Sequence, residues 1–314
     1  MQYFDLAIAI LATVILFIYG LQGFSAELQE LGRDRMRSVL GRLTSNRYSG
    51  FLLGAALTAV VQSSSAVTAI TVALVDSGAI TFANSLAVLL GANVGTTATA
   101  WLVSFELTGI GAFFIVVGAL AGVLPGPLRT FGKAIFYFGF IFFALDLLSD
   151  AMSPLKEDPA LTALLAKTSN PMIGALSGMV LTALVQSSSA ITGLVILLVQ
   201  QGVIDTQAAM AIIIGSNVGT TVTGLLGSIG ARPAAQRTAQ ANLLMNTIGV
   251  LLFLPFTSQL AAFAESVSDD PGIAVAVGHL VFNAGVAIVM LPLTKHLARL
   301  LMPDDADDPA SVGG

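Results

Sequence analysis

The sequence contains no cysteine and very few charged residues. Asp, Glu, Lys and Arg together make up 10% of its 314 residues. The absence of cysteine excludes disulfide bonds, thiolate catalysis and thiolate metal sites. Soluble globular domains carry about 25% charged residues, so the low charge content excludes that class of protein.

Hydrophobic residues dominate what is present. They account for 55% of the chain, and the mean hydropathy is +0.89. The apolar runs have the length of bilayer-spanning helices, about 20 residues, rather than the alternating pattern of outer-membrane barrel strands, which are about 10 residues long. The first run follows Met1–Asp5 without a basic segment and without a small-residue cleavage site after it. We therefore expect an all-α polytopic membrane protein whose first helix is retained and is not a signal peptide.

Two motifs occur twice, each time 124 residues apart. The segment Leu57–Thr68 returns as Leu181–Thr192 with Gln-Ser-Ser-Ser at its centre, and Gly91–Thr97 returns as Gly215–Thr221 with the pattern Gly-x-Asn-Val-Gly-Thr-Thr. Between residues 54–99 and 178–223, 23 of 46 aligned positions are identical, with no insertion. Internal duplication in an apolar chain is typical of transporters built from two related halves.

The apolar segments divide into two kinds. Two segments, 50–75 and 173–199, carry the Gln-Ser-Ser-Ser cluster in the middle, where a lipid-facing helix would not place polar groups. Because non-helical backbone at membrane depth is tolerated only inside protein or beside a water-filled cavity, we predict two re-entrant helical hairpins. The segments predicted to cross the membrane are 4–25, 81–105, 108–124, 131–150, 206–229, 236–256 and 273–294.

Basic residues predict the topology. The first crossing is followed by a predicted loop with Arg33, Arg35, Arg37, Arg42 and Arg47, which the positive-inside rule assigns to the cytoplasm. Threading the chain onward brings eleven of the thirteen basic residues to that side and leaves only Lys156 and Lys167 outside. The N-terminus is then outside and the C-terminus cytoplasmic.

Three predicted crossings separate the two hairpins, so the hairpins should open to opposite sides. This is an inverted-topology repeat, with a substrate site near the midplane. We assign residues 1–128 to the first repeat and 129–257 to the second. An extra C-terminal helix falls within 258–302, and an acidic tail covers 303–314.

The Gln-Ser-Ser-Ser clusters offer neutral ligands. Hydroxyl and amide groups both donate and accept hydrogen bonds. A half-helix beginning at Ser65 or Ser189 would direct its free amides and the positive end of its dipole at the cluster, which suits a small oxyanion. Oxygen ligands without carboxylates suit a weakly bound alkali cation.

The Gly-x-Asn-Val-Gly-Thr-Thr motifs lie within two predicted crossings. Their paired glycines predict that each crossing is broken, because glycine lets a helix unwind and frees backbone carbonyls. Asn93, Thr96 and Thr97, with the counterparts Asn217, Thr220 and Thr221, would add side-chain ligands.

No charged residue lies in the middle of these motif segments. Proton-coupled carriers usually contain intramembrane carboxylates or histidines, and we expect His279 only to pack between helices. Positive charge for an anion site would then come from helix dipoles and bound cations, which favours sodium-coupled anion transport. We expect Asn246 and Asn283 to form helix–helix hydrogen bonds, and Thr81 and Asp205 to cap helices.

The two motif pairs resemble the sodium/phosphate cotransporter type II family, including its bacterial members, over about residues 4–295. The resemblance implies sodium-driven phosphate import by alternating access, and a place in a bacterial cytoplasmic (inner) membrane. It also implies a phosphate site formed by the two clusters: Gln62, Ser63, Ser64, Ser65, Gln186, Ser187, Ser188 and Ser189. We assign the sodium ligands to both motif types: Gln62, Ser65, Thr68, Asn93, Thr96, Thr97, Gln186, Ser189, Thr192, Asn217, Thr220 and Thr221.

Alternative functions remain open at this stage. The cargo could be sulfate, arsenate or a small carboxylate, and a passive anion channel would use the same polar clusters. An enzyme is not expected, because no paired carboxylates, cysteine or metal-ligand cluster is present for hydrolysis. Expected partners are phosphate, sodium and the lipid bilayer, with a homodimer as an open alternative. No cofactor, transition metal or nucleic acid is expected.

Overall fold

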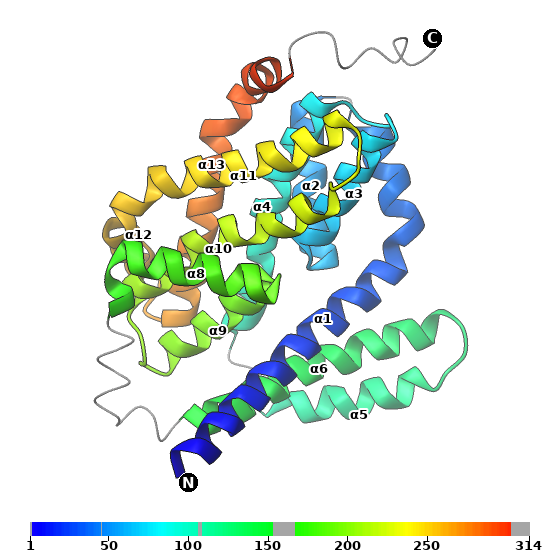
Figure 1. Cartoon of the computed structure of the whole chain (residues 1–314). Helices are drawn as coiled ribbons and strands as arrows, with labels where there is room; N and C mark the ends of the chain where they lie inside the picture. The colour runs from blue at the N-terminus through cyan, green and yellow to red at the C-terminus, as the bar shows by residue number, and fades with distance from the viewer. Residues whose placement is uncertain (1, 45, 106–108, 153–166, 303–314) are drawn as a thin grey trace.

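The computed structural model describes residues 2–44, 46–105, 109–152 and 167–302, and within these ranges the chain is helical with no strand (Figure 1). The acidic tail 303–314 and the segment with Lys156 lie outside the described residues. In the first half of the chain the helices are α1 (Gln2–Leu43), α2 (Arg47–Val61), α3 (Ser64–Asp76), α4 (Phe82–Ser104), α5 (Ile110–Gly122) and α6 (Pro127–Met152). In the second half they are η2 (Lys167–Ser169), α8 (Pro171–Val185), α9 (Ser188–Gln200), α10 (Thr206–Gly227), α11 (Pro233–Phe253), η3 (Leu254–Phe256), α12 (Thr257–Val267) and α13 (Pro271–Leu301).

Six of the seven predicted crossings correspond to helices that are long and apolar enough to span a bilayer. In the described part of the chain these are 4–32, 82–104, 128–152, 206–227, 233–267 and 271–301. The exception is the predicted crossing 108–124. Its described helix, α5, has 13 residues and is about 20 Å long, against a hydrocarbon core of about 30 Å. The all-helical polytopic fold is confirmed, but the crossing over 108–124 is not.

The first helix is longer than the sequence predicts. It continues without interruption from Gln2 to Leu43, so the predicted loop containing Arg33 to Arg42 is wrong, and these residues extend the helix beyond its apolar part. The segment has strong helix-forming residues and no glycine pair or proline to end it. The arginine-bearing end of α1 is still the end that leads into α2.

The packing of α2 against α4 determines the path of the chain in the first repeat. Gly54 lies against the Val88 backbone, Gly91 against Phe51, and Gly95 against Thr58, at approaches too close for a β-carbon. From Gly50 against Asn84 and Ala87 to Gly95 against Thr58, the contacts move forward along both helices, so α2 and α4 are parallel. The intervening α3 must therefore return toward the start of α2, which makes α2 and α3 a helix pair with a reversal at Gln62.

The second repeat has the same packing at equivalent positions. Gly178 lies against the Ile212 backbone, Gly215 against Ala175, and Gly219 against Thr182. Each of these six residues is 124 positions after its counterpart in the first repeat. The duplication in sequence is therefore a duplication in packing, with α8 parallel to α10 and α8–α9 as the second helix pair.

These glycines do not break their helices. α4 is continuous from Phe82 to Ser104 and α10 from Thr206 to Gly227, so the predicted breaks at Gly91–Gly95 and Gly215–Gly219 are wrong. Glycine is needed at these positions because another helix backbone approaches closely. Small residues that allow such approach are common in membrane helix interfaces.

The ends of the helices show how the two repeats are oriented. At the end of α9, Gln200 Nε2 donates to the carbonyl of Ser104, the last residue of α4, at 3.2 Å. At the end of α3, Asp76 accepts from the backbone N–H of Arg232, which follows α10, at 2.7 Å. We call the end of each helix pair that lies opposite its tip the base. The base of each pair thus lies beside the C-terminal end of the long helix of the other repeat, α4 or α10. It follows that α4 and α10 run in opposite directions.

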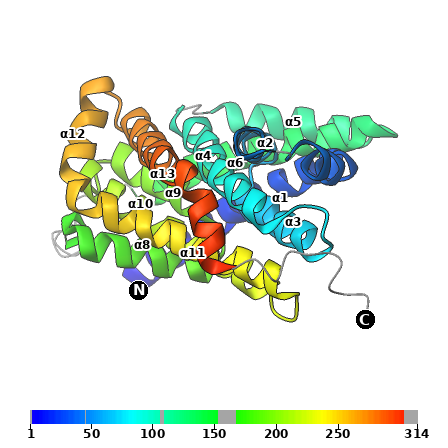
Figure 2. The same cartoon turned by 90° about the horizontal axis from the view of Figure 1, so that it is seen from above.

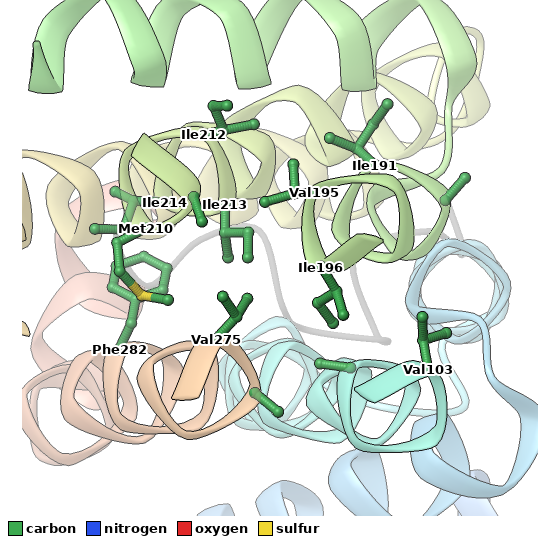
Figure 3. Close-up of a cluster of buried hydrophobic side chains, with 14 of the residues drawn as sticks. Val103, Ile191, Val195, Ile196, Met210, Ile212, Ile213, Ile214, Val275 and Phe282 are labelled. Atoms are coloured by element: carbon green, nitrogen blue, oxygen red, sulfur yellow. The ribbon is translucent and has the colours of Figure 1, made fainter. Parts of the chain in front are cut away.

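Apolar side chains fill the space where the two repeats meet. Figure 3 shows Ile196 of α9 directed toward Val103 of α4 and Val275 of α13, while Val195 lies on the side of α10. Ile196 and Val275 are fully buried. The α9 arm of the second pair is therefore packed inside the protein and not in lipid.

A peripheral unit contains α1, α5 and α6. Gly111 and Gly118 of α5 face Gly139 and Gly132 of α6 at backbone contact distance, in antiparallel order. Viewed from above, α5 lies at one edge of the protein and α12 at the opposite edge (Figure 2). This unit places α1 between α6 and the tips of the helix pairs.

The predicted asparagine contacts are confirmed. Asn93 on α4 donates to Asn246 on α11 at 2.9 Å, and Asn217 on α10 donates to Asn283 on α13 at 2.7 Å. These bonds join helices and fix their rotation. The predicted N-caps are also found, with Thr81 capping α4 and Asp205 capping α10.

Candidate functional site

The tip of each helix pair is a glutamine in a left-handed conformation. Gln62 and Gln186 both have φ of 56° and are the two non-glycine residues with positive φ in the described ranges. Each ends its helix by donating its backbone N–H to the carbonyl of the threonine four residues earlier, Thr58 or Thr182, at 2.7 Å. Left-handed conformation costs a non-glycine residue about 1–2 kcal/mol. Backbone strain of this kind clusters at functional sites, and here it occurs at both predicted sites.

The residue after each glutamine caps the next helix. Ser63 Oγ accepts from the backbone N–H of Ala66 at 3.2 Å, and Ser187 Oγ accepts from that of Ala190 at the same distance. The half-helices therefore begin at Ser64 and Ser188, one residue earlier than predicted. The first turn of a helix leaves backbone N–H groups without intrahelical partners. Four of these have no acceptor in the described part of the chain: the N–H groups of Ser64, Ser65, Ser188 and Ser189.

The two tips meet at one cavity of about 250 Å³. Its walls include no Asp, Glu, Lys, Arg or His among the described residues, so its polarity comes from hydroxyls, amides and helix N-termini. The volume is below the range of about 300–1,000 Å³ typical of drug-sized ligands, which fits a small solute. The walls comprise every residue of both Gln-Ser-Ser-Ser clusters and a face of α1: Leu21, Gln22, Ser25, Gln29, Gln62, Ser63, Ser64, Ser65, Gln186, Ser187, Ser188 and Ser189.

The two tips differ in their hydrogen bonds. Thr99 of α4 donates to Gln62 Oε1 at 2.8 Å and lies 3.3 Å from Ser189 Oγ, so it joins the two clusters. Its equivalent in the second repeat, Thr223, has a buried hydroxyl without a partner among the described residues. Gln186 is exposed, and within the described ranges its side chain makes no hydrogen bond. The first tip is therefore bonded into the protein and the second is open.

The other predicted sodium ligands do not line this cavity. Thr96 and Thr97 donate to carbonyls in their own helix, those of Ala92 and Val94. The repeat equivalents Thr220 and Thr221 do the same, and Asn93 and Asn217 are used in the helix–helix bonds described above. Thr68 and Thr192 are buried one turn from the tips, and the Thr192 hydroxyl has no partner in the described part of the chain.

Sequence reasoning missed the α1 wall. Gln22, Ser25 and Gln29 have the spacing i, i+3 and i+7, which puts them on one face of a helix. They lie toward the end of the apolar part of α1, and the helix face that they share was the available signal. It was overlooked because α1 carries neither repeated motif.

The sequence profile described as Na+/Pi-cotransporter matches residues 16–150 and again residues 147–269. The two matches each contain one helix pair and one Gln-Ser-Ser-Ser cluster. Together they cover most of the chain. The chain belongs to the Na+/Pi-cotransporter family.

Relatives of this Na+/Pi-cotransporter family member extend over nearly the whole chain. It is 31% identical over 297 residues to the uncharacterized protein YqeW of Bacillus subtilis (strain 168), covering 94% of this chain and 96% of YqeW. It is 28% identical over 303 residues to YjbB of Escherichia coli (strain K12), whose name proposes inorganic phosphate export. That match covers 96% of this chain and 56% of YjbB.

A shorter match reaches an animal protein. Over 135 residues the chain is 33% identical to sodium-dependent phosphate transport protein 2B of Homo sapiens, covering 40% of this chain and 20% of that protein. No solved structure matches the chain. Family membership and the apolar helices make this a multi-pass membrane protein of a phosphate transporter family.

Proposed function

We propose that this protein is a secondary active transporter that imports inorganic phosphate together with sodium by alternating access. The observation that carries the proposal is the single cavity of about 250 Å³ lined by both Gln-Ser-Ser-Ser clusters. The match to the Na+/Pi-cotransporter family supports phosphate as the cargo.

The chemistry of the cavity suits a small oxyanion. The free N–H groups at the starts of α3 and α9 converge on it, and the N-terminal end of a helix carries a positive partial charge of roughly half an elementary charge. Phosphate bears more negative charge than two such ends can balance. Sodium ions in the site would supply the remainder, which gives a physical reason for coupling.

The sodium ligands proposed from the sequence fall into two groups. Those at the tips, such as Gln62 and Ser189, line the cavity or bond to residues that do. Those on α4 and α10 would have to give up their present hydrogen bonds to bind an ion; these bonds are intrahelical for the threonines and interhelical for Asn93 and Asn217. We therefore favour the tip residues, with Thr192 and the unpartnered Thr223 hydroxyl as the nearest candidates to complete a site.

Alternating access would follow from an inverted arrangement of the two repeats. The antiparallel course of α4 and α10 supports two helix pairs that enter the membrane from opposite sides and meet at their tips. In this proposal the pairs are re-entrant, and the arginine-bearing end of α1 faces the cytoplasm of a bacterial cell. The N-terminus is then outside and the C-terminus inside. A homodimer is compatible with this arrangement.

The direction of transport depends on the gradients. An inward sodium gradient drives a symporter toward import, since each positive charge entering down 100 mV contributes about 2.3 kcal/mol. Export is the second candidate because of the name of YjbB. A carrier working as an exporter would lose phosphate from loaded vesicles fastest when the sodium gradient points outward.

Uptake of radiolabelled phosphate into proteoliposomes tests the proposal. An inward sodium gradient should drive accumulation that an equal potassium gradient does not, and Gln186→Ala should abolish it. Sulfate and arsenate as competitors identify the anion. Phosphate flux that is indifferent to sodium would indicate a channel, and no phosphate movement under any gradient would refute phosphate as the cargo.

A further inference from the structure

A face of α1 completes the cavity, although α1 carries neither repeated motif. Gln22, Ser25 and Gln29 line the cavity together with the two tips. Ser25 is buried, with 7% of its surface exposed. A polar stripe in a membrane-spanning helix is costly unless it serves a packed interface or a water-filled cavity. This stripe borders both.

Ser25 holds the first tip in place. Its hydroxyl donates to the carbonyl of Val61 at 3.0 Å, and Val61 is the last residue of α2. Carbonyls in the last turn of a helix have no intrahelical donor. Satisfying this one from α1 fixes the position of the left-handed Gln62 that follows.

The second repeat has no equivalent bond. Ser149, which is 124 residues after Ser25, instead accepts from Gln201 Nε2 at 2.7 Å. Within the described part of the chain no side chain donates to the Val185 carbonyl. The link between α1 and a tip therefore exists in the first half only, and Ser149 is a natural matched control for Ser25.

Gln29 separates the site from a second cavity. It donates to Ser25 Oγ at 3.0 Å, and it lines both the site and a neighbouring cavity of about 580 Å³. We call this second cavity the vestibule. It lies between α1 and α3, away from the tip and toward the arginine-bearing half of α1, and its other lining residues are Ala26, Glu30, Met36, Ala66, Ala69 and Ile70.

We propose that Ser25 and Gln29 of α1 are positioning residues of the anion site, with Ser25 fixing the first tip and Gln29 forming the divide between the site and the vestibule. The inference deepens the proposed function and depends on it for the identity of the anion. The vestibule is then the path by which ions pass between the site and the side of the membrane that the arginine-bearing end of α1 faces. The exposed Glu30 carboxylate lies on this route and attracts sodium.

The first test compares Ser25→Ala with Ser149→Ala. Binding of radiolabelled phosphate to the purified protein in sodium is measured by equilibrium dialysis, and uptake is measured in proteoliposomes. We expect Ser25→Ala to weaken phosphate binding and raise KM about 5-fold to 10-fold, the effect of one lost hydrogen bond in a site, with kcat within about 2-fold. Ser149→Ala should match the wild type, and Ser25→Thr, which keeps the hydroxyl, should restore KM.

The second test uses the absence of cysteine from the chain. In Ala69→Cys, the new thiol lies in the vestibule and should react with a membrane-impermeant thiol reagent added from the arginine-bearing side. Sodium and phosphate should slow the reaction. Ile288→Cys, on an exposed face of α13, is the control, because a thiol in lipid forms little of the reactive thiolate. Gln29→Ala in the Ala69→Cys background should reduce the protection by phosphate.

The outcomes separate the two proposals. If the wild type neither binds nor transports phosphate, the proposed function fails, and labelling of Ala69→Cys still decides whether the vestibule is water-filled. If the wild type transports phosphate but Ser25→Ala and Ser149→Ala have the same KM, the positioning role is refuted. Equal reactivity of the thiols at 69 and 288 refutes the vestibule. Should Ser25→Ala not fold, Gln29→Ala gives the same KM comparison.

Discussion

The first and second tips have the same four residues and the same backbone conformation, yet different surroundings. Gln62 is bonded to Thr99, and the carbonyl before it is bonded to Ser25. Gln186 is exposed, and the Thr223 hydroxyl is buried without a partner in the described part of the chain. Sequence identity has produced the same local fold but not the same set of contacts.

Under the proposed alternating-access mechanism, this difference has a physical reason. If the repeats were identical in every contact, both sides of the site would be open or closed together. Rocking one repeat against the other around a fixed site requires that the two halves differ at any moment. We infer that the contacts now made by Gln62 and Thr99 are those that Gln186 and Thr223 would make in the opposite state.

The largest expected effect concerns the glycines that allow close helix packing in both repeats. Gly215→Ala places a β-carbon against the Ala175 backbone, and Gly91→Ala does the same against Phe51. Each should lower the free energy of unfolding by about 3 kcal/mol or more, because a backbone cannot move aside as a side chain can. Thermal unfolding in detergent measures the loss.

Gly227→Ala is the matched control on the same helix, since nothing lies within 4 Å of its added β-carbon. It should be neutral or slightly stabilising. A large loss at only one of Gly91 and Gly215 would contradict equivalent packing in the two repeats.

The second prediction concerns the glutamines. Gln62→Ala removes bonds to Thr99 and to the Ala59 carbonyl, and should cost about 1–2 kcal/mol of stability. Gln186→Ala removes no hydrogen bond found in the described structure and should leave the unfolding temperature unchanged. Both should impair uptake, because both side chains line the cavity. Equal losses of stability in the two variants would contradict the difference in hydrogen bonding between the two tips.

Much of this comparison was readable from the sequence. The polar clusters in the middle of two apolar segments predicted two helical hairpins, and the observed helix pairs begin and end within three residues of the predicted bounds, as at Arg47 against residue 50. The polar clusters were expected to meet, and the cavity contains all eight of their residues. Periodicity and duplication carry this information because both repeats satisfy the same packing constraints.

Other features required the three-dimensional structure. Glycine pairs in a membrane helix can indicate either unwinding or close approach, and only the positions of Phe51 and Ala175 show that approach is the reason. The length of α5 was overestimated because hydropathy does not reveal where a helix ends. The α1 wall was missed because α1 carries neither repeated motif, and because the bond that gives Ser25 its role joins it to a carbonyl 36 residues away.

The third prediction compares the two threonines. Thr99→Val should cost about 1 kcal/mol because it leaves the Gln62 amide oxygen without its donor in a partly buried site. Thr223→Val should be neutral or slightly stabilising in sodium-free buffer, since it removes a buried hydroxyl that has no partner. Unfolding temperatures without sodium give the comparison.

Adding sodium sharpens this test. If Thr223 becomes a ligand or a tip contact when the second half closes, sodium with phosphate should stabilise the wild type more than Thr223→Val, by ligand linkage. Equal stabilisation of both proteins would mean that the Thr223 hydroxyl does not take part.

The smallest expected effect concerns the bases of the two helix pairs. The first pair is held by Asp76, which lies 3.8 Å from Arg232 Nε and also accepts from the Arg232 backbone. The second is held by the neutral contact of Gln200 with Ser104. Both charged side chains are about half exposed, and exposed ion pairs contribute at most about 1 kcal/mol. Asp76→Asn keeps an oxygen that can accept the backbone N–H, so we expect a loss of only about 0.5 kcal/mol.

The dependence of stability on salt separates the contribution of the Asp76–Arg232 ion pair from that of the hydrogen bond to the Arg232 backbone. Unfolding temperatures of the wild type and Asp76→Asn should converge as the salt concentration rises, because screening weakens the ion pair that only the wild type has. Gln200→Glu is the reciprocal variant, and it should lose stability at all salt concentrations, because it replaces the amide donor to the Ser104 carbonyl with an acceptor. Equal unfolding temperatures of wild type and Asp76→Asn at every salt concentration would mean that the hydrogen bond to the Arg232 backbone, which the variant keeps, and not the charge, holds the first pair to the end of α10.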